Sequence, residues 1–345
     1  MDKENTLRVA VVGCHRMLLR DLTHHNFAAA FRAIPETEIV GVFDYGAETR
    51  AEFVTCWQDV WGDIPTFGDY EHMLKEIKPD ILCIATRQTM HADQIEGAAA
   101  AGVRGILCDK PLTTTLAEMD RIISACADIP LCFGLDRRWS LSYRYLRENM
   151  SDLIGTITSL VAYGLPNTIN HGCHWYDALL GLLGDPEPLW VSGLIDYGDS
   201  DDERRKLDPP ARTQIGLDNG VVAYITMDGG KGPSFQITGT KGHLSILSDA
   251  THAHLCRENV YQSLSLPSGE EPWPTGPAMV RDLVRAIKTG GHTACAINHA
   301  RRATEIGFAI HHSSKQGGVK IALSDVDRSL RVQSFPWGNE PNTPG

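Results

Sequence analysis

The segment VAVVGCHRMLLRDLTHHNF, residues 9–27, decides how the first half of the chain folds. It begins as an apolar strand and ends that strand at Gly13, the usual start of a dinucleotide-binding turn. The fingerprint then expects a second glycine two residues later and a third small residue three positions beyond it, but these positions hold His15 and Leu18. We therefore predict a rebuilt, longer turn, with the next helix beginning near residues 19–23.

Strands and helices alternate around this segment over the first 136 residues. The strand segments are apolar and β-branched without alternation, as strands buried on both faces should be. They cover residues 7–13, 38–44, 81–86, 105–111 and 131–136. Amphipathic segments, interpreted as helices, cover residues 20–33, 47–58, 69–77, 91–101 and 115–127. This alternation predicts an α/β fold with a doubly wound parallel sheet of the Rossmann type.

The pattern changes in the second half of the chain. A strand at 155–166 and a helix at 171–184 precede several strands with glycine-rich turns, and Asn219-Gly220 favours a hairpin because it suits a turn with positive φ. We predict a dinucleotide-binding domain at residues 1–136. Residues 137–345 should form an α/β domain with a large open, mostly antiparallel sheet, whose last helices pack back on the first domain.

The composition excludes several classes of partner. The chain has 345 residues and a net charge of −11, so nucleic acid and anionic membranes are poor partners. No segment is long and apolar enough for a membrane span. Cys83, Cys108 and Cys132 lie in apolar runs without CxxC spacing, so we expect reduced thiols in a cytoplasmic protein. The histidine pairs at 24–25 and 311–312 make poor metal sites because neighbouring side chains point in different directions on a helix.

Asp44 is the main evidence for the choice of cofactor. An acidic residue that closes the second strand can bind both hydroxyls of an adenosine ribose and repel the 2′-phosphate of NADP, so we predict NAD, with NADP disfavoured. The alternative readings are a simple turn cap at Asp44 and a decayed cofactor site at the altered turn. Phosphate binds free backbone N–H groups, which requires no further glycine, and His15 should point away from it. We assign cofactor binding to Gly13, Cys14, His15, Arg16, Met17, Asp44, Thr86, Arg87, His91, Asp109 and Lys110.

Two later segments supply the candidates for chemistry. Lys110 ends a buried strand just before Pro111, where its side chain faces the crevice and is available for proton transfer, although a lysine at a strand end is more often solvated. Asn170 and His174 are four residues apart and share one helix face, and His174 can move a proton to or from a substrate hydroxyl. A packed structural histidine is the alternative. We assign catalysis to Lys110, His174 and Asn170, and substrate binding to Lys110, Arg138, Trp139, Asn170, His171 and His174, with no metal.

In this order and spacing, the motifs resemble the glucose–fructose oxidoreductase, inositol dehydrogenase and MocA family (Gfo/Idh/MocA), over nearly the whole chain. Family members carry a strand that ends in Ala-Thr with a histidine shortly after, a Glu-Lys-Pro motif, and a helix start of the form acid-x-x-x-His-x-x-Asp. The matching residues here are Ala85, Thr86 and His91, then Asp109-Lys110-Pro111, then Asn170, His174 and Asp177. The chain departs from the pattern at the glycine turn and at Asn170, where the family usually has an acid.

The resemblance implies hydride transfer between NAD(P) and a hydroxyl-bearing carbon of a sugar, sugar derivative, polyol or cyclitol, with Lys110 and His174 as the catalytic pair. It also implies a homo-oligomer, a dimer or tetramer, formed through the C-terminal sheet. Two alternatives remain open. One is an enzyme that retains NAD and uses transient oxidation for elimination, glycoside cleavage or epimerisation. The other is a non-catalytic sugar-binding or regulatory homologue that has lost its cofactor site.

Overall fold

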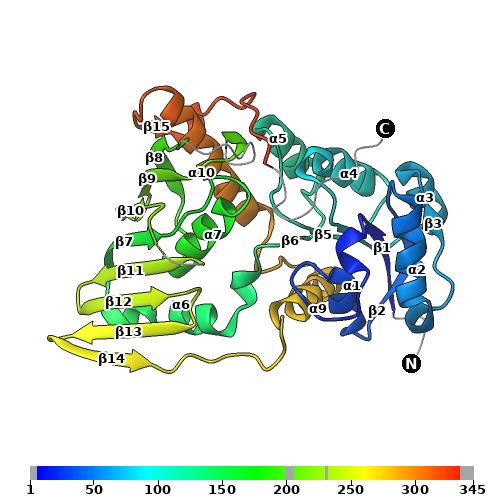
Figure 1. Cartoon of the computed structure of the whole chain (residues 1–345), viewed down its shortest axis with the longest axis horizontal. Coiled ribbons are helices and arrows are strands. Elements are labelled where there is room, and N and C mark those ends of the chain that lie inside the picture. The colour runs from blue at the N-terminus through cyan, green and yellow to red at the C-terminus, as the bar shows by residue number, and fades with distance from the viewer. Residues whose placement is uncertain (1–5, 199–205, 230–231, 335–345) are drawn as a thin grey trace.

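The first half of the chain forms a six-stranded parallel sheet in the strand order β3-β2-β1-β4-β5-β6, as a computed structural model describing residues 6–198, 206–229 and 232–334 shows (Figure 1). This is the order of a dinucleotide-binding Rossmann sheet, so the predicted fold class is confirmed. Its strands are β1 (Leu7–Val12), β2 (Thr37–Phe43), β3 (Thr66–Phe67), β4 (Ile81–Ile84), β5 (Gly105–Cys108) and β6 (Leu131–Phe133).

Three of these strands end earlier than the apolar pattern predicts. β4, β5 and β6 end two or three residues before the limits expected from the sequence at 86, 111 and 136. The polar residues that follow them therefore lie in loops at the carboxyl edge of the sheet. Ligands of open α/β sheets bind at this edge, so the shortening moves the candidate site residues toward a crevice.

Capping side chains explain where several helices of the first half begin. They are α1 (Phe27–Arg32), α2 (Ala47–Trp61), α3 (Tyr70–Ile77), α4 (Gln88–Ala100) and α5 (Leu116–Ala125). The Asp69 side chain caps α3, and Thr115 with Glu118 forms a capping box on α5. The helix predicted at 20–33 begins only at Phe27, because the Asn26 side chain caps it by accepting the Ala29 N–H.

The second half forms a nine-stranded mixed sheet in the order β14-β13-β12-β11-β7-β10-β9-β8-β15. All neighbouring pairs are antiparallel except β7 with β10, which agrees with the predicted mostly antiparallel sheet. The predicted hairpin at Asn219-Gly220 joins β9 to β10, with Gly220 at φ +84°. The strands are β7 (Ile157–Tyr163), β8 (Pro188–Ile195), β9 (Ala211–Leu217), β10 (Val222–Ile225), β11 (Ser234–Gly239), β12 (Gly242–Leu247), β13 (His252–Arg257), β14 (Val260–Leu264) and β15 (Ile321–Ala322).

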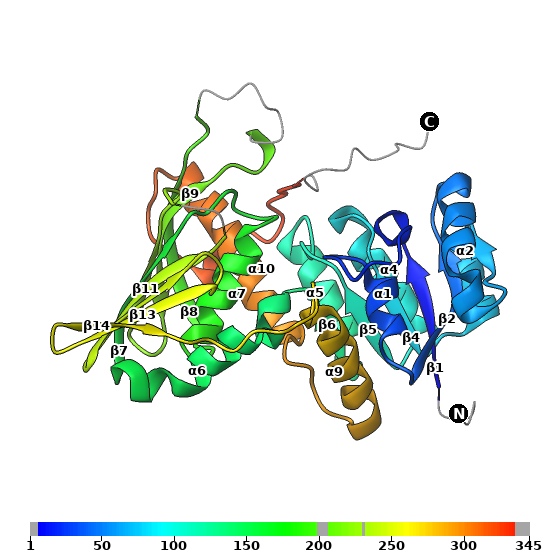
Figure 2. The same ribbon diagram turned by 60° about the horizontal axis from the view of Figure 1, so that its bottom comes forward.

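Helices cover only the inner face of this sheet. α6 (Leu141–Ile154), α7 (Gly172–Leu182) and α10 (Ile297–Lys315) lie between the sheet and the first half of the chain (Figure 2). The sequence analysis did not predict α6. Within the described residues, no helix covers the outer face of the sheet, and none has the length and apolar character that a membrane span requires.

The two halves are joined by more than one crossing of the chain. α9 (Thr275–Thr289) packs against α1 and β5 of the first half, beside β6, as Figure 1 also shows. The segment after β15 returns as well: the Val332 N–H donates to the Thr114 carbonyl at 2.9 Å, and the Gln88 amide donates to the carbonyls of Thr113 at 3.0 Å and Val332 at 3.3 Å. These contacts tie the loop after β5 and the start of α4 to the segment around Val332.

Candidate active site

The connection between β1 and α1 is long, as predicted, but differs in detail from the expected turn. Gly13 leaves β1 with φ +83°, and a Cβ at this position would lie 2.9 Å from the carbonyl carbon of Ala85. A 3₁₀ turn, His15–Met17, follows instead of the first turn of an α-helix. The prediction that α1 begins near residues 19–23 is wrong, because the Asn26 amide also donates to the carbonyls of Leu19 and Asp21 and holds this stretch as a loop.

Side chains of this turn point in different directions. Cys14 and Met17 are fully buried, and the Met17 carbonyl accepts the Trp57 indole N–H at 2.7 Å. Their side chains therefore cannot reach a cofactor, and their backbone N–H groups are already bound, that of Cys14 to Asp44 at 2.9 Å and that of Met17 to the Cys14 carbonyl at 2.8 Å. His15 is exposed and lines a hollow of about 580 Å³ that Lys110 also borders. Arg16 lies nearer the strand ends, with Nη1 3.9 Å from the Asp109 carboxylate.

Asp44 closes β2 and faces the turn. Its Oδ2 accepts the Cys14 backbone N–H at 2.9 Å, and its Oδ1 accepts the Gly46 N–H at 3.0 Å. A carboxylate offers about four acceptor positions, so both oxygens retain capacity for hydroxyl donors. Burial, followed by the Asp44 charge, raises the pKa of the Cys14 thiol far above its ordinary value. The Arg50 guanidinium donates to the carbonyls of Asp44 and Tyr45, the latter at 3.1 Å.

The loop after β4 corrects one of the predicted cofactor contacts. His91 is completely buried, with Nδ1 3.0 Å from the Leu112 carbonyl and Nε2 3.2 Å from the Thr86 carbonyl. It therefore ties two loops together and does not reach the crevice, so we withdraw its assignment to cofactor binding. Thr86 stays at the crevice beside Gly13, and its hydroxyl donates to Gln94 at 2.6 Å. Arg87 precedes the first residue of α4 and is partly exposed.

Asp109 is a buried carboxylate surrounded by positive charge. Its Oδ1 accepts the Lys110 backbone N–H at 2.8 Å and lies 3.1 Å from Nδ1 of His25, whose backbone is left-handed at φ +67°. Burial favours a raised pKa, but the charge and hydrogen bond of His25 and the charges of Lys110 and Arg16 outweigh it and hold the pKa of Asp109 well below its usual value. Asp109 thus anchors the rebuilt turn and has no free edge toward the cavity.

Lys110 meets the start of α7. Its Nζ donates to Oδ1 of Asn170 at 2.7 Å, which joins the two halves of the chain at the expected site. Asn170 is held in turn by Asp208, a buried carboxylate that accepts the backbone N–H groups of Ile169 and Asn170 and the Thr168 hydroxyl, each at 2.8 Å. Burial raises the pKa of Asp208, although these hydrogen bonds oppose the rise.

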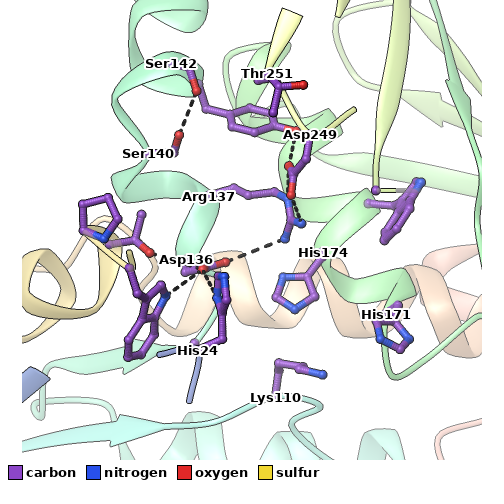
Figure 3. Close-up of a pocket in the computed structure, with 18 of the residues that line it drawn as sticks. His24, Lys110, Asp136, Arg137, Ser140, Ser142, His171, His174, Asp249 and Thr251 are labelled. Carbon is purple, nitrogen blue, oxygen red and sulfur yellow. Dashed lines mark hydrogen bonds and ion pairs between the residues drawn. The ribbon is translucent and has the colours of Figure 1, made fainter. Parts of the chain in front are cut away.

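The two histidines of the α7 start face the space above Lys110 (Figure 3). Asn167 fixes His171, because its Oδ1 accepts the His171 N–H at 2.7 Å and its Nδ2 contacts the ring Nδ1 at 2.8 Å. Burial and the charges of Lys110 and Arg137 lower the pKa of His171 to about 4. Burial and the charges of Arg137 and Lys110 also lower the pKa of His174 well below its usual value, and its Nδ1 has no hydrogen-bond partner among the described residues.

Arg138 and Trp139 are the second correction. Arg138 is buried and paired with Asp177 and Asp185 at 2.6 and 2.7 Å, and the Trp139 indole donates to Asp282 at 3.0 Å. Neither side chain lines the cavity, so we withdraw their assignment to substrate. The 3₁₀ turn Asp136–Trp139 presents its first two residues to the cavity, and no pattern in the sequence distinguishes these positions from their two neighbours.

These residues surround one large cavity of about 1300 Å³ between the two halves of the chain. Figure 3 shows Lys110 at one end, the two histidines beside it, and Arg137 with Asp249 farther away. The sequence analysis missed Asp136, Arg137, Asp208 and Asp249. Among the described residues, no three histidine, cysteine or acidic side chains are arranged to hold a metal ion.

Family comparisons identify this architecture. Residues 7–134 match a model described as an oxidoreductase family NAD-binding Rossmann fold, and residues 165–323 match the C-terminal alpha/beta domain of the same family. The chain belongs to the Gfo/Idh/MocA oxidoreductase family. The resemblance inferred from the motifs is therefore confirmed.

Individual relatives of this Gfo/Idh/MocA protein match over shorter stretches. The chain is 26% identical over 154 residues to D-xylose 1-dehydrogenase (NADP(+)) 2 of Haloferax volcanii, covering 37% of this chain and 46% of that protein. It is 30% identical over 150 residues to D-apiose dehydrogenase of Paraburkholderia graminis, covering 43% of this chain and 37% of that protein. The matches thus span less than half the length of these relatives.

Solved structures of similar fold cover nearly the whole molecule. An oxidoreductase from Agrobacterium radiobacter, in complex with NAD⁺, L-tartaric acid and magnesium, aligns with a TM-score of 0.77 at 16% identity, over 92% of this chain and 98% of that one. The aldose-aldose oxidoreductase from Caulobacter crescentus aligns with a TM-score of 0.74 at 16% identity, over 92% and 99%. At this identity the likeness concerns the fold.

The residues of the Gfo/Idh/MocA Rossmann domain fit NAD. Gly13 brings the turn against the backbone just after β4, where a Cβ would lie 2.9 Å from Ala85, so this close approach requires glycine. The first N–H groups of a helical turn have no acceptor within the turn. In the 3₁₀ turn His15–Met17 the Met17 N–H bonds the Cys14 carbonyl, so the donors that fit a pyrophosphate begin with the His15 N–H. Asp44 presents acceptor capacity at the ribose position. The altered glycine motif is therefore compatible with a rebuilt cofactor loop.

Proposed function

We propose that the chain is an NAD-dependent oxidoreductase acting on a hydroxyl-bearing carbon of a sugar, sugar derivative, polyol or cyclitol. The observation that carries this proposal is the 2.7 Å bond between Lys110 and Asn170, which places an amine at the carboxyl edge of the Rossmann sheet and at the wall of the large cavity. Membership of an oxidoreductase family with an NAD-binding Rossmann fold supports it.

Lys110 and His174 then have different roles. Lys110 commits one donor to Asn170. In the oxidation its neutral amine takes the proton of the substrate hydroxyl, and in the reduction its ammonium returns that proton. His174 faces the same space, and its lowered pKa keeps the ring neutral near pH 7, so it orients the hydroxyl through a hydrogen bond. Bound NAD supplies the hydride acceptor or donor. Asn170 orients the Lys110 amine.

A panel of aldoses, polyols and cyclitols incubated with NAD⁺ tests the proposal, with NADH formation as the readout. At least one of these substrate classes should give NADH with the unaltered protein, and this NADH formation should be lost in the Lys110→Ala variant. No NADH with any class, together with no nucleotide binding on titration, would favour the non-catalytic homologue. Nucleotide released from the denatured protein separates the remaining alternative: NAD that exchanges freely supports the dehydrogenase, whereas tightly retained NAD supports transient oxidation within one turnover.

We propose NAD as the preferred nucleotide because the Asp44 carboxylate faces the ribose position. Arg50 is the nearest cation found there, but its Nη1 already donates to the backbone carbonyls of Asp44 and Tyr45. A side-by-side titration should show tighter binding of NADH than of NADPH. In the Asp44→Ala variant, the two affinities should be closer to each other. Equal or tighter NADPH binding by the unaltered protein would contradict the proposal.

We also propose that the boundary between the two domains lies between residues 136 and 137.

We propose in addition that the chain forms a homo-oligomer, a dimer or tetramer, through the outer face of the large sheet. That face exposes Leu194, Tyr224 and Leu247 on a sheet side that no described helix covers. Sedimentation of the purified protein should show a dimer or tetramer, and Tyr224→Arg should shift it toward monomer. A monomer at micromolar concentration would exclude this arrangement.

A further inference from the structure

The cavity is larger than one sugar ring requires. Its volume of about 1300 Å³ exceeds the ~300–1,000 Å³ usual for pockets that bind drug-sized ligands, which are themselves larger than a monosaccharide. Figure 3 shows that the cavity runs from Lys110 past Arg137 to a second region bordered by Ser140, Ser142 and Thr251. In the proposed reaction the nicotinamide end of NAD and the reacting ring share the end of the cavity at Lys110, and the second region is left for another part of the substrate.

The carboxylate of Asp249, which is held by several hydrogen bonds, borders the second region beside Thr251. Oδ1 of Asp249 accepts the Arg137 Nε–H at 2.7 Å and the Tyr143 hydroxyl at 2.9 Å, and a second Arg137 nitrogen bonds the other oxygen. The Asp249 side chain is nevertheless 37% exposed, compared with 17% for Arg137. These three bonds leave acceptor capacity on a carboxylate that cannot rotate away, an arrangement suited to sugar hydroxyl donors.

The backbone that carries Asp249 is unusual. Ser248, Asp249 and Ala250 are three successive non-glycine residues in the left-handed region, at φ +48°, +59° and +56°. Such backbone persists only where surrounding contacts enforce it, and it gathers at ligand-binding positions. Here the Asp249 N–H donates to the Pro233 carbonyl at 2.9 Å, and the Ser248 N–H donates to the Ser234 hydroxyl at 3.0 Å. The turn directs Asp249 toward the cavity.

The far region combines hydroxyl groups with apolar walls. The hydroxyls of Ser140 and Ser142 are 3.0 Å apart, and Thr251 lies across from them in Figure 3. Leu266 and Pro272 border the same cavity from the segment between β14 and α9. A sugar ring presents hydroxyls at its edge and C–H groups on its faces, so this mixture of surfaces matches a second ring.

We propose that the substrate is a glycoside larger than a monosaccharide, with its reacting ring at Lys110 and a second sugar ring in a distal subsite formed by Ser140, Ser142, Asp249 and Thr251. This inference rests on the proposed function for the reaction itself. The geometry that carries it is the extension of the cavity beyond Arg137 and the fixed, partly exposed Asp249 carboxylate that borders its far region.

Monosaccharide and disaccharide pairs that share the non-reducing ring provide the test: glucose with cellobiose, galactose with lactose, and xylose with xylobiose. For the pair that reduces NAD⁺ fastest, kcat/KM should be at least about tenfold higher for the disaccharide, the effect of roughly one or two well-placed hydrogen bonds. A monosaccharide that is used equally well or better overturns the distal subsite.

Variants then locate the effect. Ser142→Ala and Asp249→Asn should each reduce the disaccharide-to-monosaccharide ratio of kcat/KM several-fold, whereas Ser263→Ala on the distant strand β14 serves as the control. An unchanged ratio in both variants, with folding verified by circular dichroism, overturns the assignment of these residues. If no pair reduces NAD⁺, the dehydrogenase proposal fails separately, and calorimetry with the same pairs decides the subsite: tighter disaccharide binding supports it, and equal or weaker binding overturns it.

Discussion

In the reaction that we propose, Lys110 transfers the proton and His174 orients the substrate hydroxyl, and neither side chain contributes a contact that the Rossmann turn needs. Lys110→Ala and His174→Ala should therefore lose most activity, about 10²–10⁴-fold in kcat, while NAD still binds. Steady-state assays of kcat and a titration with NAD, carried out on each variant, provide the measurement. Near-normal turnover by either variant would remove that residue from the mechanism.

Asp208 acts at a distance from the substrate, through Asn170. Because its carboxylate holds two backbone N–H groups at the start of α7, its loss should misplace the Asn170 side chain that orients Lys110. Asp208→Ala should lower kcat about tenfold, leave the affinity for NAD unchanged, and have little further effect in an Asn170→Ala background. Additive losses in the double variant, with melting temperatures as the folding control, would show a general structural role instead.

At the scale of an element, the turn between β1 and the 3₁₀ segment depends on one glycine. Gly13 combines φ +83° with a backbone neighbour 2.9 Å from an added Cβ, so Gly13→Ala must displace the turn from β4. We expect NAD affinity to fall at least about tenfold, with a loss of stability of roughly 1–3 kcal/mol.

Gly102 is the matched control for this element. It has a similar φ of +78°, but an added Cβ there would meet no atom within 4 Å. Gly102→Ala should therefore lose some stability through backbone strain and keep its affinity for NAD. Equal losses of NAD affinity in both variants would mean that strain alone, without the contact to Ala85, explains the effect.

At the scale of the whole molecule, buried histidines make stability depend on pH. Burial is the main cause that lowers the pKa of His91, His171, His174, His299 and His311, and for His171, His299 and His311 the value falls to about 4 from 6.5. Between about pH 4 and pH 6.5, the unfolded chain thus binds more protons than the folded chain. Their contribution to stability is complete above pH 6.5 and is lost as pH falls toward 4.

Urea unfolding should therefore show a lower midpoint at about pH 5 than at about pH 7.5. The free energy of unfolding should fall by roughly 1.4 kcal/mol per pH unit for each such histidine below its unfolded-state pKa. Asp177, Asp208 and Glu305 act in the opposite direction, because burial raises their pKa values. His311→Gln should reduce the dependence on pH. A midpoint that is constant over this range would contradict the sign of the histidine effect.

Local patterns in the sequence determined the Rossmann sheet, the mostly antiparallel second sheet and the family, because strand alternation, turn chemistry and motif spacing are local properties. The resemblance to the family, and no local pattern, suggested that Lys110 acts together with the start of α7. Only the tertiary structure decided which of two neighbouring side chains reaches the large cavity. Arg137 rather than Arg138 faces it, since a 3₁₀ turn sets the direction of successive side chains, and His91 is buried because two loops close over it. Asp208 and Asp249 reach the site from loops far along the chain, and contacts between distant segments leave no periodic trace in the sequence.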